Sequence, residues 1–212
     1  MPPVAAARPV VITPGVQRGR VVIVIVDRLS IGDLVATSMP HFRALLKKGA
    51  MGLMNDNTAG QQIPENTYAT IGAGAHIAAP GTAALGFNAW EKLPTGTAGE
   101  EYRSYTGQEV PAGSLVELGI AGIVRQTREL PYPALPGAIG SALHAVGLKT
   151  AALGNADNPS GLQRQVVTVA MDNRGLVDYG DVGDDLLTLD PSFPGGMRTD
   201  YEKLQARFAA HR

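Results

Sequence analysis

Six consecutive β-branched residues at positions 21–26, Val-Val-Ile-Val-Ile-Val, constrain the fold of this chain more than any other stretch. The run shows no alternation of polar and apolar residues, so it predicts a strand covered on both faces, as in a parallel sheet. Asp27 would then lie at the carboxyl end of a buried strand. Because ligands bind at the carboxyl ends of strands in open α/β sheets, Asp27 is a candidate for chemistry. The alternative is that Asp27 caps a turn or the next helix.

Helical and strand patterns alternate along the rest of the chain. Apolar spacing and end signals predict helices over 39–49, 64–71, 116–128, 137–146 and 199–210. Further strands are expected over 50–54, 149–153, 165–171 and 177–179. This order predicts an α/β fold, a doubly wound, mostly parallel sheet with helices on both faces. We divide the chain into an N-terminal extension, 1–20, and an α/β domain, 21–212, with an irregular, Gly- and Pro-rich insertion around 78–114.

Composition excludes several classes of protein. The chain has 212 residues, enough for one ordinary domain, and a net charge of −1, which gives no general reason to bind nucleic acid or an anionic membrane. It has no cysteine, which excludes disulfides, thiolate metal sites and a thiol nucleophile. No window supplies the ~20 apolar residues of a transmembrane helix. No signal peptide stands out, so the sequence leaves the compartment open between cytoplasm and export.

Three blocks of the sequence carry a family resemblance when taken together. The first is 21–50, the apolar run and Asp27 followed by a helix that ends Leu-Leu-Lys-Lys-Gly-Ala. The second is 64–74, Pro-Glu-Asn-Thr-Tyr-Ala-Thr-Ile-Gly-Ala-Gly, and the third is 143–155, a helix–strand pattern ending Leu-Gly-Asn. In this order they resemble the N-terminal half of the alkaline phosphatase superfamily, which includes phosphatases, phosphodiesterases, sulfatases and cofactor-independent phosphoglycerate mutases. The segments 154–157 and 171–177 look closest to an uncharacterised bacterial branch.

The resemblance implies a metal-dependent hydrolase or transferase acting on phosphate esters or similar small anions. In that superfamily the acid after the first strand binds a divalent metal, commonly zinc or manganese, and this role falls on Asp27. A hydroxyl at the start of the second block attacks phosphorus, and a metal makes it nucleophilic at neutral pH. The expected nucleophile position, ten residues before Gly74, is Pro64, which has no nucleophilic group. The candidates are therefore the neighbouring hydroxyls of Thr58 and Thr67.

Other departures from the family pattern keep a second interpretation open. Asn155 stands where sulfatases carry a lysine, which argues against a sulfatase. The superfamily takes its remaining metal ligands from the second half of its fold, so we expect this sequence to be C-terminally incomplete and inactive alone, with an unpaired sheet edge that favours self-association. The four histidines show no ligand spacing, and the acids of 178–185 are expected to form an exposed loop. The alternative function is a non-catalytic binding or scaffold protein with the same fold.

Overall fold

The computed structural model describes residues 19–52, 54–55 and 57–210. The chain divides into two compact units, Met1–Met54 and Asn55–Arg212, and each is described here by itself. None of the helices in the described residues has the length and apolarity needed to cross a bilayer.

The first unit contains two short helices. Helix α1 (Ile31–Ala36) begins at Ser30, which forms a reciprocal capping box with Asp33. Helix α2 (Pro40–Lys48) confirms the predicted helix over 39–49, with proline in its first turn and Gly49 at its end. Neither helix buries a residue.

The strand predicted over 21–26 is not formed. These residues lie outside every helix and strand, and Val21 is 90% exposed and Val24 78% exposed. A strand requires a neighbouring backbone, and the described residues of this unit contain no second strand with which the run could pair. The described residues of the strand predicted over 50–54 are likewise in no strand, and residue 53 lies outside the described part.

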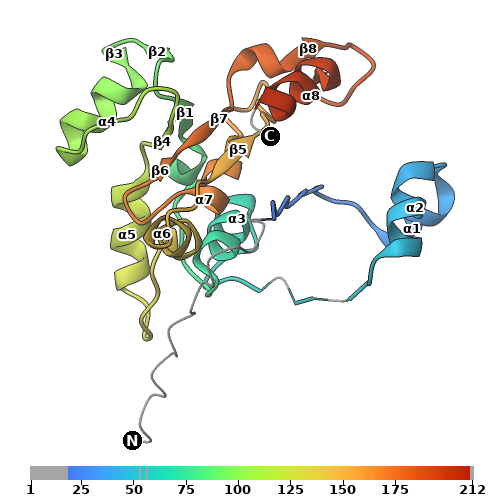
Figure 1. The fold of residues 1–212 in the computed structure, drawn as a ribbon, viewed down its shortest axis with the longest axis horizontal. Coiled ribbons are helices and arrows are strands. Elements are labelled where there is room, and N and C mark those ends of the chain that lie inside the picture. Colours follow the sequence, from blue (N-terminus) through green and yellow to red (C-terminus); the bar gives the residue numbers. More distant parts are fainter. Residues whose placement is uncertain (1–18, 53, 56, 211–212) are drawn as a thin grey trace, which may run out of the picture. The chain divides into compact units, whose positions relative to one another are not determined.

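Small sheets lie at the centre of the second unit (Figure 1). Strand β4 (Leu115–Glu117) pairs antiparallel with both β1 (Gly86–Asn88) and β6 (Leu176–Val177). Strand β5 (Ala151–Leu153) pairs with β7 (Tyr179–Asp181) in parallel. Two antiparallel pairs complete the strands of the described residues: β2 (Lys92–Leu93) with β3 (Gly96–Thr97), and β8 (Leu187–Leu189) with β9 (Met197–Thr199). The fold is therefore mixed α/β, built from several small sheets.

Helices pack around the central strands and close the hydrophobic core. They are α3 (Pro64–Ala73), α4 (Ala98–Thr106), α5 (Ile120–Arg128), α6 (Ala138–Ala145), α7 (Val166–Ala170) and α8 (Tyr201–Ala210), with 3-10 turns at Gly81–Ala84 and Asp184–Leu186. Helix α3 packs against α6 and α7 (Figure 1). The core contains Leu115 and Val116 of β4, Val167 of α7 and Ala69 of α3.

Predictions for the second unit also differ from the structure: the helix predicted over 116–128 begins only at Ile120, after strand β4. The strand predicted over 165–171 is helix α7, whose residues 167–169 are buried and which packs against α3, so tertiary contacts override the β propensity of the run. The stretch expected to be irregular contains β1, β2, β3 and α4. Helix α4 begins with a capping box between Thr97 and Glu100, a Thr-x-x-Glu signal that is present in the sequence.

The contact between α3 and α7 depends on a glycine. A Cβ atom at Gly72 would lie 2.1 Å from the carbonyl oxygen of Thr168 and 3.0 Å from the Cα of Val169. Both contacts are with backbone, so the helices would have to separate. We expect Gly72→Ala to lower the free energy of unfolding by about 1–3 kcal/mol, measured by urea denaturation. The matched control is Gly81→Ala, whose Cβ meets nothing within 4 Å; equal stabilities of the two variants would contradict this account.

Candidate functional site

The two candidate nucleophiles lie at the amino end of α3. The Thr58 hydroxyl donates to the carbonyl oxygen of Gln61 at 3.1 Å, and the side-chain amide of Asn66 donates to the same oxygen at 2.8 Å. The Thr67 hydroxyl donates to the Ile63 carbonyl oxygen at 3.2 Å. Both hydroxyls therefore donate to carbonyl groups of the residues that lead into α3.

Asn66 fixes this helix end to the core. Its side chain is buried, and its Oδ1 accepts from the backbone N–H of Ala79 at 2.6 Å. Pro64 occupies the first turn, where its missing N–H costs nothing. The polar geometry around Thr58 and Thr67 is thus held by a buried side chain rather than by the loop alone.

This arrangement has a definite chemical capacity. A hydroxyl that donates its proton to a carbonyl keeps its lone pairs for another partner. The amino end of a helix carries partial positive charge and amide N–H groups, which favour an anion. Glu65 also lies in the first turn of α3 and opposes an anion there. The site can therefore present a hydroxyl to an anionic group.

Asp27 belongs to the other unit. It is exposed and lies in a turn at the end of the 21–26 run, and Arg28 beside it has a left-handed backbone with φ of 57°. Within the described residues, no three His, Asp or Glu side chains are grouped so that they could hold a metal ion. The side chains described here do not by themselves make a metal site, and we derive no reaction step through a metal.

The carboxyl ends of β5 and β7 hold a second group of polar side chains. Asn155, just after β5, is buried and donates to the Val182 carbonyl oxygen at 2.9 Å. Asp181, at the end of β7, accepts from Asn88 at 3.0 Å and from Arg207 of α8 at 2.7 Å. The polar groups at this edge are therefore bound to one another.

Arg164 is the buried centre of that edge. Its side chain is 2% exposed and lies over the ring of Phe87, 5.2 Å from the centroid. Its guanidinium donates to Asp157 at 2.7 Å, to Glu91 at 2.6 Å and to Asp184. Burial alone would lower the pKa of this guanidinium, but hydrogen bonds to Glu91 and Asp157 hold that pKa above its usual range.

A third cluster lies just before the amino ends of β5 and β7. The Nε2 atom of His144 is 2.7 Å from Asp178, and its Nδ1 atom is 3.5 Å from Asp172. Lys149 pairs with Asp178 at 2.7 Å, and Arg174 pairs with Asp172 at 2.8 Å. Burial raises the pKa of Asp178, but hydrogen bonds from Lys149, the Thr150 amide and His144 outweigh it and hold that pKa below its usual range.

A cavity of about 260 Å³ is lined in part by four of these side chains, those of His144, Lys149, Arg174 and Asp178. The Nε2 atom of His144 is at hydrogen-bond distance from Asp178, and Nδ1 faces Asp172 from farther away. Each cation at the cavity is likewise paired with a buried or half-buried acid. The cluster therefore ties helix α6 to the segment that leads into β7.

Sequence reasoning missed these polar clusters. The acids of 178–185 were expected to form an exposed loop, but Asp181 is buried and the side chain of Asp178 is only 14% exposed. The histidine–aspartate pairing joins residues 34 positions apart, and Arg164 reaches Glu91 across 73. No spacing rule signals such contacts, because they arise only when the strands assemble.

Comparison of the chain with protein-family models, curated proteins and solved structures finds no match to any of them.

Proposed function

We propose that this chain acts in the metal-dependent hydrolysis or transfer of small phosphate esters, with Thr58 or Thr67 as nucleophile and Asp27 as a ligand of zinc or manganese. The proposal includes the wider fold that the resemblance implies, a doubly wound, mostly parallel sheet. One observation carries it. The hydroxyls of Thr58 and Thr67 lie at the amino end of α3, the position at which a helix favours an anion.

The step assigned to the threonine forms one bond to phosphorus and breaks another. Its hydroxyl oxygen forms a bond to phosphorus while the bond from phosphorus to the leaving alcohol breaks. The hydroxyl proton goes to solvent, and the leaving alkoxide takes a proton. Water then attacks the threonyl phosphate in a hydrolase, and an acceptor alcohol attacks it in a transferase. Asn66 acts as a positioning residue, because it holds the Gln61 carbonyl to which Thr58 donates.

A bound divalent metal would lower the pKa of the attacking hydroxyl and offset charge in the transition state. Asp27 is one carboxylate, and a catalytic metal needs about three protein ligands. The others would have to come from residues that the described clusters do not include. The proposal therefore makes metal binding an independent measurement, separate from turnover.

We expect Thr67→Val or Thr58→Val, whichever removes the nucleophile, to lower turnover by about 100-fold or more. The assay is made on the protein at its full natural length, with p-nitrophenyl phosphate and bis(p-nitrophenyl) phosphate and added zinc or manganese. Thr106→Val is the matched control for Thr67→Val, since Thr106 also donates to the carbonyl four residues earlier in its helix, at 2.8 Å. Thr67→Ser should restore part of any loss at Thr67. Turnover that survives in both Thr58→Val and Thr67→Val would overturn the assignment.

Asp27→Ala tests the metal ligand. It should abolish metal-dependent turnover. The circular dichroism spectrum should stay the same, which would show that the second unit is still folded. Turnover that is unaffected by Asp27→Ala would remove Asp27 from the site.

The second candidate is a non-catalytic binding or scaffold protein with this fold. Pro64 favours it, because a residue without a nucleophilic group stands at the position where the resemblance expects one. Calorimetry with zinc and manganese distinguishes the two candidates. Tight, stoichiometric metal binding that Asp27→Ala weakens counts against a scaffold, and no metal binding favours it.

A further inference from the structure

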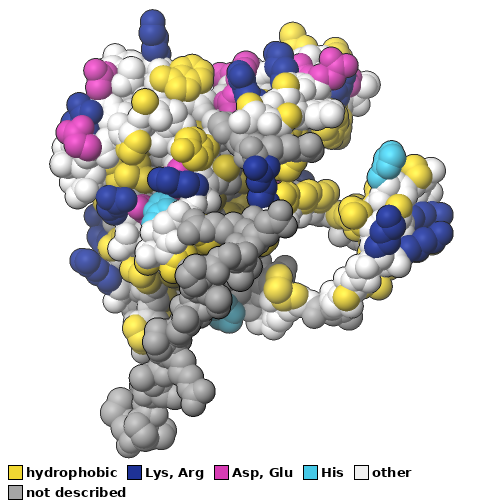
Figure 2. All heavy atoms as spheres, in the orientation of Figure 1, with side chains coloured by type: hydrophobic (Ala, Val, Ile, Leu, Met, Phe, Trp, Pro, Cys, Tyr) yellow, Lys and Arg dark blue, Asp and Glu magenta, His cyan; other side chains and the backbone are white. Residues whose placement is uncertain are grey.

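Residues 21–26 expose both faces of an apolar, strand-forming run. On one face Val21 is 90% exposed and Ile23 is 58% exposed; on the other, Val22 is 57% and Val24 is 78% exposed. Apolar side chains around α1 and α2 also face solvent (Figure 2). A six-residue run of this kind, without charge, proline or glycine, is the composition that pairs with further strands.

We propose that residues 21–26 pair antiparallel with the same segment of a second copy of this chain, about a two-fold axis between Ile23 and Val24. A two-fold interface brings one patch onto itself, so a single segment supplies both sides. In this register Val21 lies opposite Val26, and Val22 opposite Ile25. Pairing satisfies the backbone groups along one edge of each strand and places apolar side chains of the two copies side by side.

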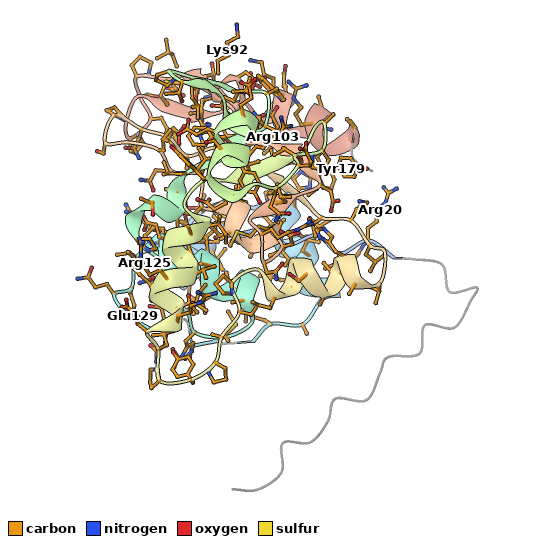
Figure 3. The ribbon with its side chains drawn as sticks, turned by 90° about the vertical axis from the view of Figure 1, so that its left-hand side faces the viewer. Arg20, Lys92, Arg103, Arg125, Glu129 and Tyr179 are labelled. Atoms are coloured by element: carbon orange, nitrogen blue, oxygen red, sulfur yellow. The ribbon has the colours of Figure 1, made fainter. Side chains whose placement is uncertain are left out.

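The flanking charges select the partner and the direction. Arg20 precedes the run and Asp27 follows it, and both are exposed. Figure 3 shows the Arg20 side chain beside the start of the run, extended from the backbone. Antiparallel pairing puts Arg20 of each copy opposite Asp27 of the other, which is favourable, whereas parallel pairing would put like charges together.

The inference rests on the exposed run and its flanking charges and not on the proposed function, but the two assign different roles to Asp27 and to residues 21–26. A metal at Asp27 and the second copy's Arg20 would compete for the same carboxylate, so the association is measured in the presence of a chelator. Loss of catalysis and loss of association then have separate readouts. A failed phosphatase assay leaves this inference intact, and a monomeric chain leaves the phosphatase proposal intact.

The experiment is sedimentation of the 212-residue chain over a wide range of concentrations. We expect a reversible dimer, and we expect Val24→Asp to weaken it at least about tenfold. Val35→Asp is the control, because Val35 is 73% exposed in the same unit but lies on α1. Far-ultraviolet circular dichroism checks that the second unit, which contains most of the helices and strands of the described residues, stays folded in every variant.

A charge exchange tests the register. Arg20→Asp should weaken the dimer about two- to fivefold, and adding Asp27→Arg to it should restore the dimer. A chain that is monomeric at every concentration overturns the inference, as does a dimer that Val24→Asp leaves unchanged. A double exchange that does not restore association overturns the antiparallel register. If the chain instead forms open-ended assemblies, and Val24→Asp abolishes them, the closed two-fold pair is overturned.

Discussion

Replacing Arg164 with methionine should lower the free energy of unfolding by about 3–5 kcal/mol, because the change leaves carboxylates without their cation in a nearly water-free place. The side chains of Asp157 and Glu91 are 14% and 18% exposed, and both receive hydrogen bonds from the guanidinium. The Arg164–Asp184 pair contributes little, since the Asp184 side chain is 82% exposed. A loss of this size is a large part of the stability of an ordinary domain.

Further variants separate charge from packing. Glu91→Gln and Asp157→Asn neutralise the two acids that lose their cation. Added to Arg164→Met, they should recover part of the lost stability, because the unpaired charges cause that loss. Arg103→Met is the matched control: its side chain is 50% exposed and pairs with an exposed acid, so the change should cost under about 1 kcal/mol. Figure 3 labels Arg103 on α4. Urea denaturation of each variant gives the values, and an Arg164→Met chain as stable as Arg103→Met would contradict the assignment.

Local sequence signals predicted the helices whose first and last turns carry clear start and stop residues, such as proline and glycine. Helix α3 begins at Pro64 as predicted and runs to Ala73, two residues past the predicted end, where Gly74 caps it with a φ of 62° that suits glycine. Helix α6 falls within the predicted 137–146, and α8 within 199–210. These signals act within a few residues, so they are readable without knowledge of the rest of the chain.

Elements that depend on distant partners could not be read in this way. The Val-Val-Thr-Val run of α7 has the composition of a strand, but it is helical where it meets Gly72 of α3. The run at 21–26 has the same strand composition and forms no strand. Propensity states what a segment favours, and neighbours along the fold decide what it becomes.

The same distinction applies to the candidate site: features set by residues close in the sequence could be predicted, and contacts between distant residues could not. The positions of Thr58 and Thr67 near the start of α3 could be expected, because both lie within a few residues of Pro64 in the sequence. The buried cation at Arg164 could not, because its partners come from loops that only the assembled strands bring together. Glu117 is also invisible to pattern reasoning, since it occupies an inward position of β4 that the sequence assigned to a helix.

The stability of the chain should fall as pH rises from about 4.5 to about 8, and Glu117 should be a main cause. Its side chain is fully buried, and burial raises its pKa to about 8, against a slight opposing effect of the hydrogen bond from the Gly119 amide. The folded state therefore keeps a proton that the unfolded state has already released. The stability that comes from this retained proton is fully present below the pKa that Glu117 has in the unfolded chain. It is lost as the pH rises toward the pKa in the folded chain, by up to about 1.4 kcal/mol per pH unit.

Glu117→Gln should remove this dependence and make the chain more stable than wild type above pH 8, because an amide of the same shape never ionises. It also keeps the acceptor for the Gly119 N–H, which Oε1 now binds at 2.9 Å. The second oxygen, Oε2, has no hydrogen-bond partner among the described residues, so ionisation there would meet no compensating donor. The measurement is urea denaturation at a series of pH values. Glu129→Gln, an exposed carboxyl at the end of α5 (Figure 3), is the control and should leave the wild-type pH slope in place. If Glu117→Gln and wild type lose stability in parallel as pH rises, then Glu117 is ionised in the folded chain and an unseen donor must satisfy Oε2.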